Sequence, residues 1–166
     1  MDRPTVTTAR AAEIVGIGYE GFRSYLKRGL GGRVGMLPGF HKPGGDTFDD
    51  PAPRAKWKRF NVSDLCLFRV AKLLMDAGFS FEAANSVVSR HEHWAAFTYD
   101  SAPVHRMLAI WPPYGDHIVY EPDQLELLKK ALEAAPEIVT LINLGAAHEH
   151  VLVALKETVM TVDAEQ

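Results

Sequence analysis

Cysteine, long apolar runs and catalytic motifs are scarce or missing in this chain. Its 166 residues include a single cysteine, Cys66, which excludes an internal disulfide and a zinc site built from several cysteines of one chain. No run of about 18 apolar residues occurs, so the sequence predicts neither a transmembrane helix nor a membrane partner. Residues 1–4 lack the basic and apolar segments of a secretory leader, and we therefore expect a cytoplasmic protein.

The sequence also lacks the common signatures of catalysis. It contains no Gly-x-Ser-x-Gly, no His-Glu-x-x-His, no Cys-x-x-Cys and no phosphate-binding glycine loop. Asp49, Asp50 and Asp116 offer carboxylates, but each belongs to a flexible or turn segment that holds no second group nearby. We predict that the protein is not an enzyme and that it uses no cofactor.

Two identical tripeptides, His91-Glu92-His93 and His148-Glu149-His150, raise the question of a metal site. On a helix, residues two apart point about 200° away from each other, so neither pair can chelate one ion. Solvent-facing histidines explain the pattern better, and we predict no metal site. The alternative that stays open is a site assembled across segments from His91, His105, His117 and His148.

Charge is divided unevenly along the chain. Residues 1–60 carry eleven Lys or Arg against six Asp or Glu, whereas residues 61–166 carry seven against fifteen. With 47% hydrophobic residues the chain has enough apolar content to fold. A basic N-terminal part joined to an acidic remainder is consistent with binding phosphate on one face.

Two helices are predicted at the N-terminus. Thr7 or Thr8 can cap a helix that ends at Gly16, and the Gly16-Ile17-Gly18 turn then leads into a helix over Tyr19–Arg28 that closes at Gly29. Apolar residues of the second helix fall on one side, and its basic residues occupy the rest of the cylinder. The apolar residues are Phe22, Tyr25 and Leu26, and the basic residues are Arg23, Lys27 and Arg28.

The next part of the chain predicts a long wing and two more helices. Glycine and proline are dense over residues 31–56, which we interpret as an enlarged wing. Asn61 or Ser63 can cap a core helix that Gly78 ends, and Ser80 can cap a fourth helix that continues to about Trp94 or Phe97. The break before Pro103 predicts that a first domain spans residues 1–98.

Residues 104–166 are predicted to form a second, smaller domain. Val104–Trp111 and His117–Tyr120 are β-prone runs that suggest a hairpin, and Ile138–Leu144 reads as a buried third strand. A helix bearing Leu125, Leu128 and Leu132 precedes that third strand, and a final helix bearing Val151 and Leu155 follows it. The expected fold is therefore mostly α with small β elements.

Residues from about 6 to 90 resemble the DNA-binding domain of the MerR family of transcription regulators. Gly78-Phe79-Ser80 fits the start of the family's fourth helix, Asp64-Leu65 fits the third, and Trp57-Lys58-Arg59-Phe60 looks like the end of its wing. The first two helices match without a gap at Thr8, Ala12, Gly16, Ile17, Phe22, Arg23, Tyr25, Gly29 and Leu30. The resemblance implies an N-terminal winged helix-turn-helix followed by the small α+β C-terminal domain.

The resemblance also implies a function. It predicts a sequence-specific, nucleoid-associated regulator that binds double-stranded DNA as a homodimer, with the second helix in the major groove. Arg can donate two parallel hydrogen bonds to guanine, whereas a wing lysine supplies a point charge to phosphate. The expected DNA-binding residues are Tyr19, Glu20, Arg23, Ser24, Tyr25, Lys27, Arg28, Lys56, Lys58 and Arg59.

Other readings of the same residues stay open. The winged module also suits an architectural or DNA-processing adaptor, such as an excisionase-like protein or a phage packaging DNA-recognition subunit, and it suits a protein-interaction scaffold. Pro103 interrupts any long dimerising helix, so the C-terminal part is the expected oligomerisation or partner surface, through the Leu125-Leu128-Leu132 or Val151-Leu155 stripe. Aromatic residues of the same part are an alternative lining for a small-molecule pocket. They are Phe97, Tyr99, Trp111, Tyr114 and Tyr120.

Overall fold

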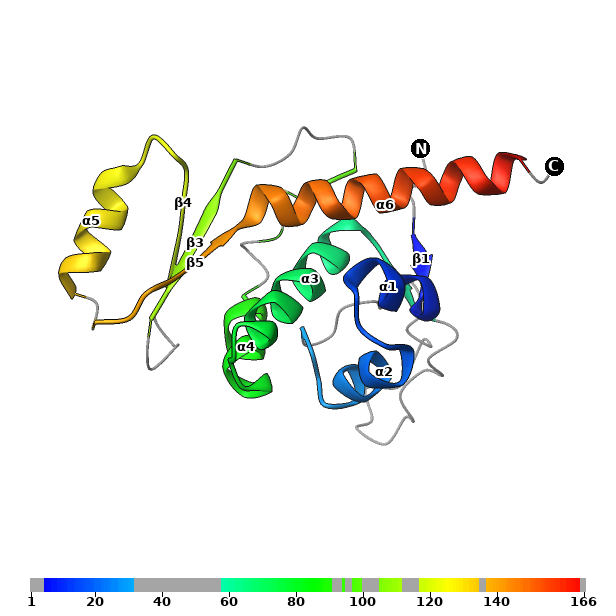
Figure 1. The fold of residues 1–166 in the computed structure, drawn as a ribbon, viewed down its shortest axis with the longest axis horizontal. Coiled ribbons are helices and arrows are strands. Elements are labelled where there is room, and N and C mark those ends of the chain that lie inside the picture. The colour runs from blue at the N-terminus through cyan, green and yellow to red at the C-terminus, as the bar shows by residue number, and fades with distance from the viewer. Residues whose placement is uncertain are drawn as a thin grey trace, which may run out of the picture.

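The computed structural model describes residues 5–31, 58–90, 94, 97–99, 105–111, 117–134 and 137–164. Within these residues the chain is mixed α/β, with six helices and two small antiparallel sheets (Figure 1). None of these helices combines the length and apolar character that crossing a membrane requires. The helices are α1 Thr8–Val15, α2 Tyr19–Lys27, α3 Val62–Asp76, α4 Phe81–Val88, α5 Leu125–Ala134 and α6 Leu144–Ala164. The strands are β1 Val6–Thr7, β2 Arg59–Phe60, β3 Met107–Ile110, β4 His117–Tyr120 and β5 Thr140–Asn143.

The two N-terminal helices begin and end where the sequence predicts. Thr7 accepts a hydrogen bond from the Arg10 backbone N–H at 3.4 Å and so caps α1. Gly16 ends α1 with φ at +82°, a conformation that favours glycine. A Cβ on Gly16 would also make a tight contact, 3.1 Å from the Arg69 guanidinium, which would have to shift slightly. Arg28 is the cap residue of α2, one residue before Gly29 turns the chain.

The starts of α3 and α4 are confirmed, but α4 is shorter than predicted. Asn61 and Asp64 form a reciprocal capping box on α3, and the Ser80 hydroxyl accepts from Ala83 N–H to cap α4. The expectation that α4 continues to about Trp94 or Phe97 is wrong, since α4 ends at Val88. The indole N–H of Trp94 donates to the Val88 carbonyl at 2.8 Å, which satisfies a helix-terminal acceptor.

The second sheet confirms the predicted hairpin and corrects the third strand. Its order is β4-β3-β5, and β3 pairs antiparallel with both neighbours, so that Leu108 lies opposite Val119 and Ile142. The prediction that the third strand is buried is wrong. β5 is an edge strand that alternates between half-buried and exposed residues, and Leu141 is 51% exposed. The reason is topological, because β3 takes the central position.

The hydrophobic core continues across the predicted boundary near residue 100. Val151 and Leu155 of α6 belong to the same cluster of buried residues as the cores of α1 and α3. Figure 1 shows α6 running from the sheet over α3 and α1. The prediction that Val151 and Leu155 form an exposed interaction stripe is therefore wrong.

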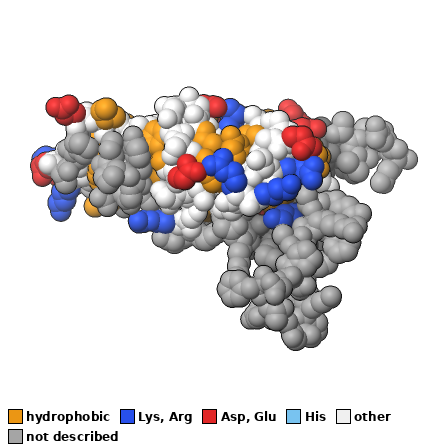
Figure 2. Space-filling model, turned by 90° about the horizontal axis from the view of Figure 1, so that it is seen from below, with side chains coloured by type: hydrophobic (Ala, Val, Ile, Leu, Met, Phe, Trp, Pro, Cys, Tyr) orange, Lys and Arg blue, Asp and Glu red, His pale blue; other side chains and the backbone are white. Residues whose placement is uncertain are grey.

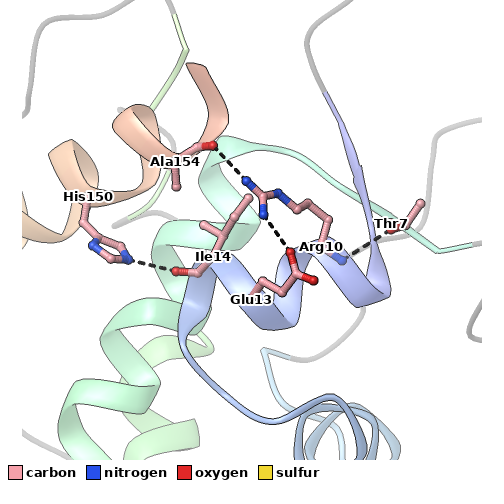
Figure 3. A network of polar contacts seen from close by, with 6 residues as sticks. All are labelled: Thr7, Arg10, Glu13, Ile14, His150 and Ala154. Atoms are coloured by element: carbon pink, nitrogen blue, oxygen red, sulfur yellow. Dashed lines mark hydrogen bonds and ion pairs between the residues drawn. The ribbon is translucent and has the colours of Figure 1, made fainter. Parts of the chain in front are cut away.

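Polar contacts fasten α6 to α1 beside this core (Figure 3). The Arg10 guanidinium donates to the Ala154 carbonyl at 3.4 Å and pairs with Glu13 at 2.6 Å. His150 Nε2 donates to the Ile14 carbonyl at 2.9 Å. Because these side chains satisfy carbonyls of the facing helices, they fix the position of α6 along α1.

His148 is fully buried, so the prediction of a solvent-facing histidine is wrong at this position. Its burial provides a pH-dependent test of the fold. Its Nε2 donates to the Thr98 carbonyl at 3.1 Å, and its ring meets the edge of Phe97. Burial lowers the pKa of His148 below its usual value of 6.5. As pH falls, His148 is therefore protonated in the unfolded state at a higher pH than in the folded state. We expect the free energy of unfolding to fall as pH drops below about 6.5.

The contribution of His148 can be separated from that of the other histidines with a His148→Gln variant, whose side-chain amide still donates to a carbonyl. Urea unfolding between pH 7 and pH 5, monitored by circular dichroism, should show a smaller loss of stability for this variant than for the wild type. Equal losses in the two proteins would contradict a neutral, desolvated His148.

Candidate nucleic-acid interface

Three phenylalanines fix the second helix against the strand that ends the predicted wing. Phe22 of α2 contacts Phe60 of β2 and Phe68 of α3, with ring centroids 5.9 and 5.1 Å apart. Phe60 and Phe68 contact each other at 5.4 Å, and all three side chains are fully buried. We refer to Phe22, Phe60 and Phe68 as the phenylalanine triangle. It makes α2, β2 and α3 one packed unit.

The outward side of α2 carries five of the predicted DNA-binding residues. Helical geometry places them over one continuous face, opposite the buried Phe22. Arg23 pairs with Glu20 at 3.1 Å and lies 5.5 Å from the centre of the Tyr19 ring. Figure 2 shows Lys and Arg side chains gathered on the face seen from below, with Asp or Glu side chains beside them. The five residues on the outward side of α2 are Tyr19, Glu20, Arg23, Ser24 and Lys27.

Tyr25 and Arg28 face α4 instead. The Tyr25 ring stacks on Phe81 at 5.4 Å, and the Arg28 guanidinium lies 3.9 Å from the centre of the same ring. Arg28 also pairs with Glu82 at 2.7 Å. Hydrogen bonds from the backbone and from Arg28 lower the pKa of the Glu82 carboxyl. These contacts attach the end of α2 to α4.

Asn85 is a positioning residue that the sequence did not reveal. Its side-chain oxygen accepts from the Gly31 backbone N–H at 2.8 Å, and its amide nitrogen donates to the Gly29 carbonyl at 3.3 Å. Asn85 therefore replaces the backbone partners that the chain loses where α2 ends. The sequence around Asn85 does not indicate these contacts, because they join positions that are 54 and 56 residues apart.

Two predicted wing cations lie at β2, beside the phenylalanine triangle. Arg59 is exposed opposite Thr7 of β1, because alternate residues of a strand point to opposite sides and Phe60 points inward. Lys58 is half-buried, and desolvation lowers the pKa of its ammonium group. Within the described residues, no carboxylate forms an ion pair with Lys27, Lys58 or Arg59. Of the expected wing over residues 31–56, only Gly31 belongs to the described residues, so Lys56 lies outside them.

The described residues give little support for either alternative ligand site, the metal site or the small-molecule pocket. No three His, Cys, Asp or Glu side chains among them are grouped to hold a metal ion. His91 and the side chain of His117 lie outside that set. Of the aromatic residues considered for a pocket, Phe97 and Tyr120 are buried, Tyr99 and Trp111 are half-buried, and Tyr114 lies outside the described residues.

Comparison of the chain with protein-family models and with curated proteins gives no match.

Proposed function

We propose that this protein is a sequence-specific regulator of transcription that binds double-stranded DNA through a winged helix-turn-helix. The main support is the packing of Phe22 on Phe60, which joins α2, with its exposed face, to the strand at which the cations Lys58 and Arg59 lie. Neither of these cations has an ion-pair partner in the described part of the chain. Unpaired cations beside an exposed helix form a surface that can hold phosphates while the helix contacts base edges.

The proposal divides the predicted contacts into three roles. Tyr19, Arg23 and Ser24 read base edges in the major groove, because they lie on the outward face of α2. Lys27, Lys58, Arg59 and, outside the described residues, Lys56 bind phosphates. Tyr25 and Arg28 orient α2 through α4, where both contact Phe81.

Two features of α2 itself favour an anionic partner. Gly18 at the N-cap provides no side-chain hydrogen bond, so the first backbone N–H groups can donate to a phosphate. Arg23 is half-exposed, and among the described residues its ion-pair partner is Glu20 of the same helix, an exposed pair of about 0.2–1 kcal/mol. Exchanging this weak pair for a bidentate bond to guanine favours binding.

Substitutions at Arg23 and Lys58 distinguish the reading of bases from the binding of phosphates. Arg23→Ala should cost about 1–3 kcal/mol on the cognate site and relax specificity at one base position. Lys58→Ala should weaken binding to all sequences alike and reduce the slope of log affinity against log salt by about one. Titrations by fluorescence anisotropy at several salt concentrations measure both effects. Sequence-independent losses from both variants would contradict base reading by Arg23.

The proposed function is tested by selecting DNA from a random duplex pool with the purified protein. Enrichment of one motif, bound at least about a thousandfold better than scrambled DNA, is the expected result. The matched control is Lys130→Ala, which removes an exposed cation on α5 and should leave affinity unchanged. A steep salt dependence without enrichment would instead support the architectural adaptor, and absence of binding would refute both.

A further inference from the structure

The last four carbonyls of α1 all accept hydrogen bonds, although a helix by itself leaves such groups without partners. The turn after α1 supplies partners for the first two. The N–H groups of Gly16 and Ile17 donate to the Ala12 carbonyl at 2.9 and 3.0 Å, and Gly16 N–H also donates to the Glu13 carbonyl at 3.1 Å. The next two carbonyls accept from side chains of other helices.

Those two side chains belong to α3 and α6. The Arg69 guanidinium of α3 donates to the Val15 carbonyl at 2.9 Å. His150 of α6 donates from Nε2 to the Ile14 carbonyl, also at 2.9 Å (Figure 3). A carbonyl can only accept, so the ring nitrogen is the donor. The end of α1 is therefore held from two separate helices that lie 54 and 136 residues later in the chain.

Side chains of α3 also cover the turn that leads from α1 to α2. A Cβ on Gly16 would lie 3.1 Å from the Arg69 guanidinium and 3.4 Å from the Lys72 side chain. Arg69 and Lys72 are three residues apart, so they lie on the same face of α3. Residues 16–18 are the whole connection between the two helices. Because this connection is so short, a shift at the end of α1 moves the start of α2.

We propose that Arg69 and His150 are positioning residues for α2, which hold the end of α1 and so set the direction in which α2 presents Arg23. The phenylalanine triangle holds the middle of α2, and the stacking of Tyr25 on Phe81 holds its end. Arg69 and His150 hold its start. This inference rests on the proposed function and adds α6, from the C-terminal part of the chain, to the DNA-binding unit.

Residual dipolar couplings of backbone N–H groups, measured by NMR without DNA, give the orientation of α2 relative to α3. His150→Leu removes one donor and Arg69→Met removes the other. Each should turn α2 by about 10° or more, the tolerance that a binding site allows. His150→Gln should keep the wild-type orientation, because its amide nitrogen lies as many bonds from the backbone as Nε2 does. The control Glu149→Leu alters the exposed neighbouring residue and should also leave α2 in place.

A residue that only stabilised the fold would lower the free energy of unfolding without turning α2. Unchanged couplings in either His150→Leu or Arg69→Met would therefore overturn the proposal. His150 is exposed, so its variants keep the fold and decide the test if Arg69→Met does not fold.

The ratio of affinities for the selected motif and for scrambled DNA tests the same role in DNA reading. His150→Leu should lower this ratio at least about threefold, the effect of one lost hydrogen bond, and His150→Gln should restore it. Lys58→Ala should weaken both affinities alike and leave the ratio unchanged. An unchanged ratio in His150→Leu would overturn the role of His150 in DNA reading. A wild type that selects no motif would refute the proposed function, and the couplings would still show whether Arg69 and His150 position α2.

Discussion

Replacing Phe68 with alanine is expected to lower the free energy of unfolding by about 3–5 kcal/mol. Phe68 is fully buried and contacts both other members of the phenylalanine triangle edge-on, at 5.1 and 5.4 Å. Its removal loses the transfer free energy of the ring and leaves a cavity that α2, β2 and α3 together enclose. Urea unfolding followed by circular dichroism measures the change as a shift in the midpoint.

The matched control for Phe68 is Tyr19→Ala, which deletes an aromatic ring that is 43% exposed. The Tyr19 ring contacts Arg23 but buries little surface, so we expect Tyr19→Ala to lower the free energy of unfolding by less than about 1 kcal/mol. If the two variants lost equal stability, the triangle could not be the packed unit that positions α2. If Phe68→Ala retains its fold, affinity for DNA should fall for every sequence, because α2 and β2 would no longer be held together.

Local signals explain why the helix starts were predictable. The hydroxyls of Thr7 and Ser80 and the amide of Asn61 each accept from a backbone N–H within the next three residues. Gly16 and Gly29 end helices by adopting positive φ. These effects act over one turn of chain, and the residue types that produce them can be read directly from the sequence.

Contacts between residues far apart in the chain determine the features that could not be predicted from the sequence. The end of α4 depends on the Trp94 indole, which donates to a carbonyl six residues earlier in the chain. The role of Arg28 is set by Glu82, a partner 54 residues away, and a helical wheel of α2 alone cannot distinguish it from Lys27. A pattern of charges predicts a basic surface, but only the tertiary structure shows which cations are already paired.

The same limit applies to the apolar stripes of the C-terminal part. The leucines of α5 and the Val151-Leu155 stripe of α6 have similar helical spacing, yet the first stripe is largely exposed and the second is buried. Their different environments follow from the chain path, because α6 returns to α3 while α5 stays at the far end of the sheet. Periodicity identifies an apolar face and does not identify the surface that covers it.

Replacing Leu155 with alanine is expected to cost about 2–5 kcal/mol and to lower the stability of the whole chain in one transition. Leu155 lies on α6, after the predicted boundary, but it belongs to the same buried cluster as Phe22 and Phe68. Val153→Ala on the same helix is the control, and at 51% exposure it should change stability by no more than about 0.5 kcal/mol. Differential scanning calorimetry distinguishes one transition from two. A separate transition that Leu155→Ala leaves unchanged would mean that the N-terminal part folds without α6. The N-terminal part, with α2 and β2, would then be an independently stable folding unit.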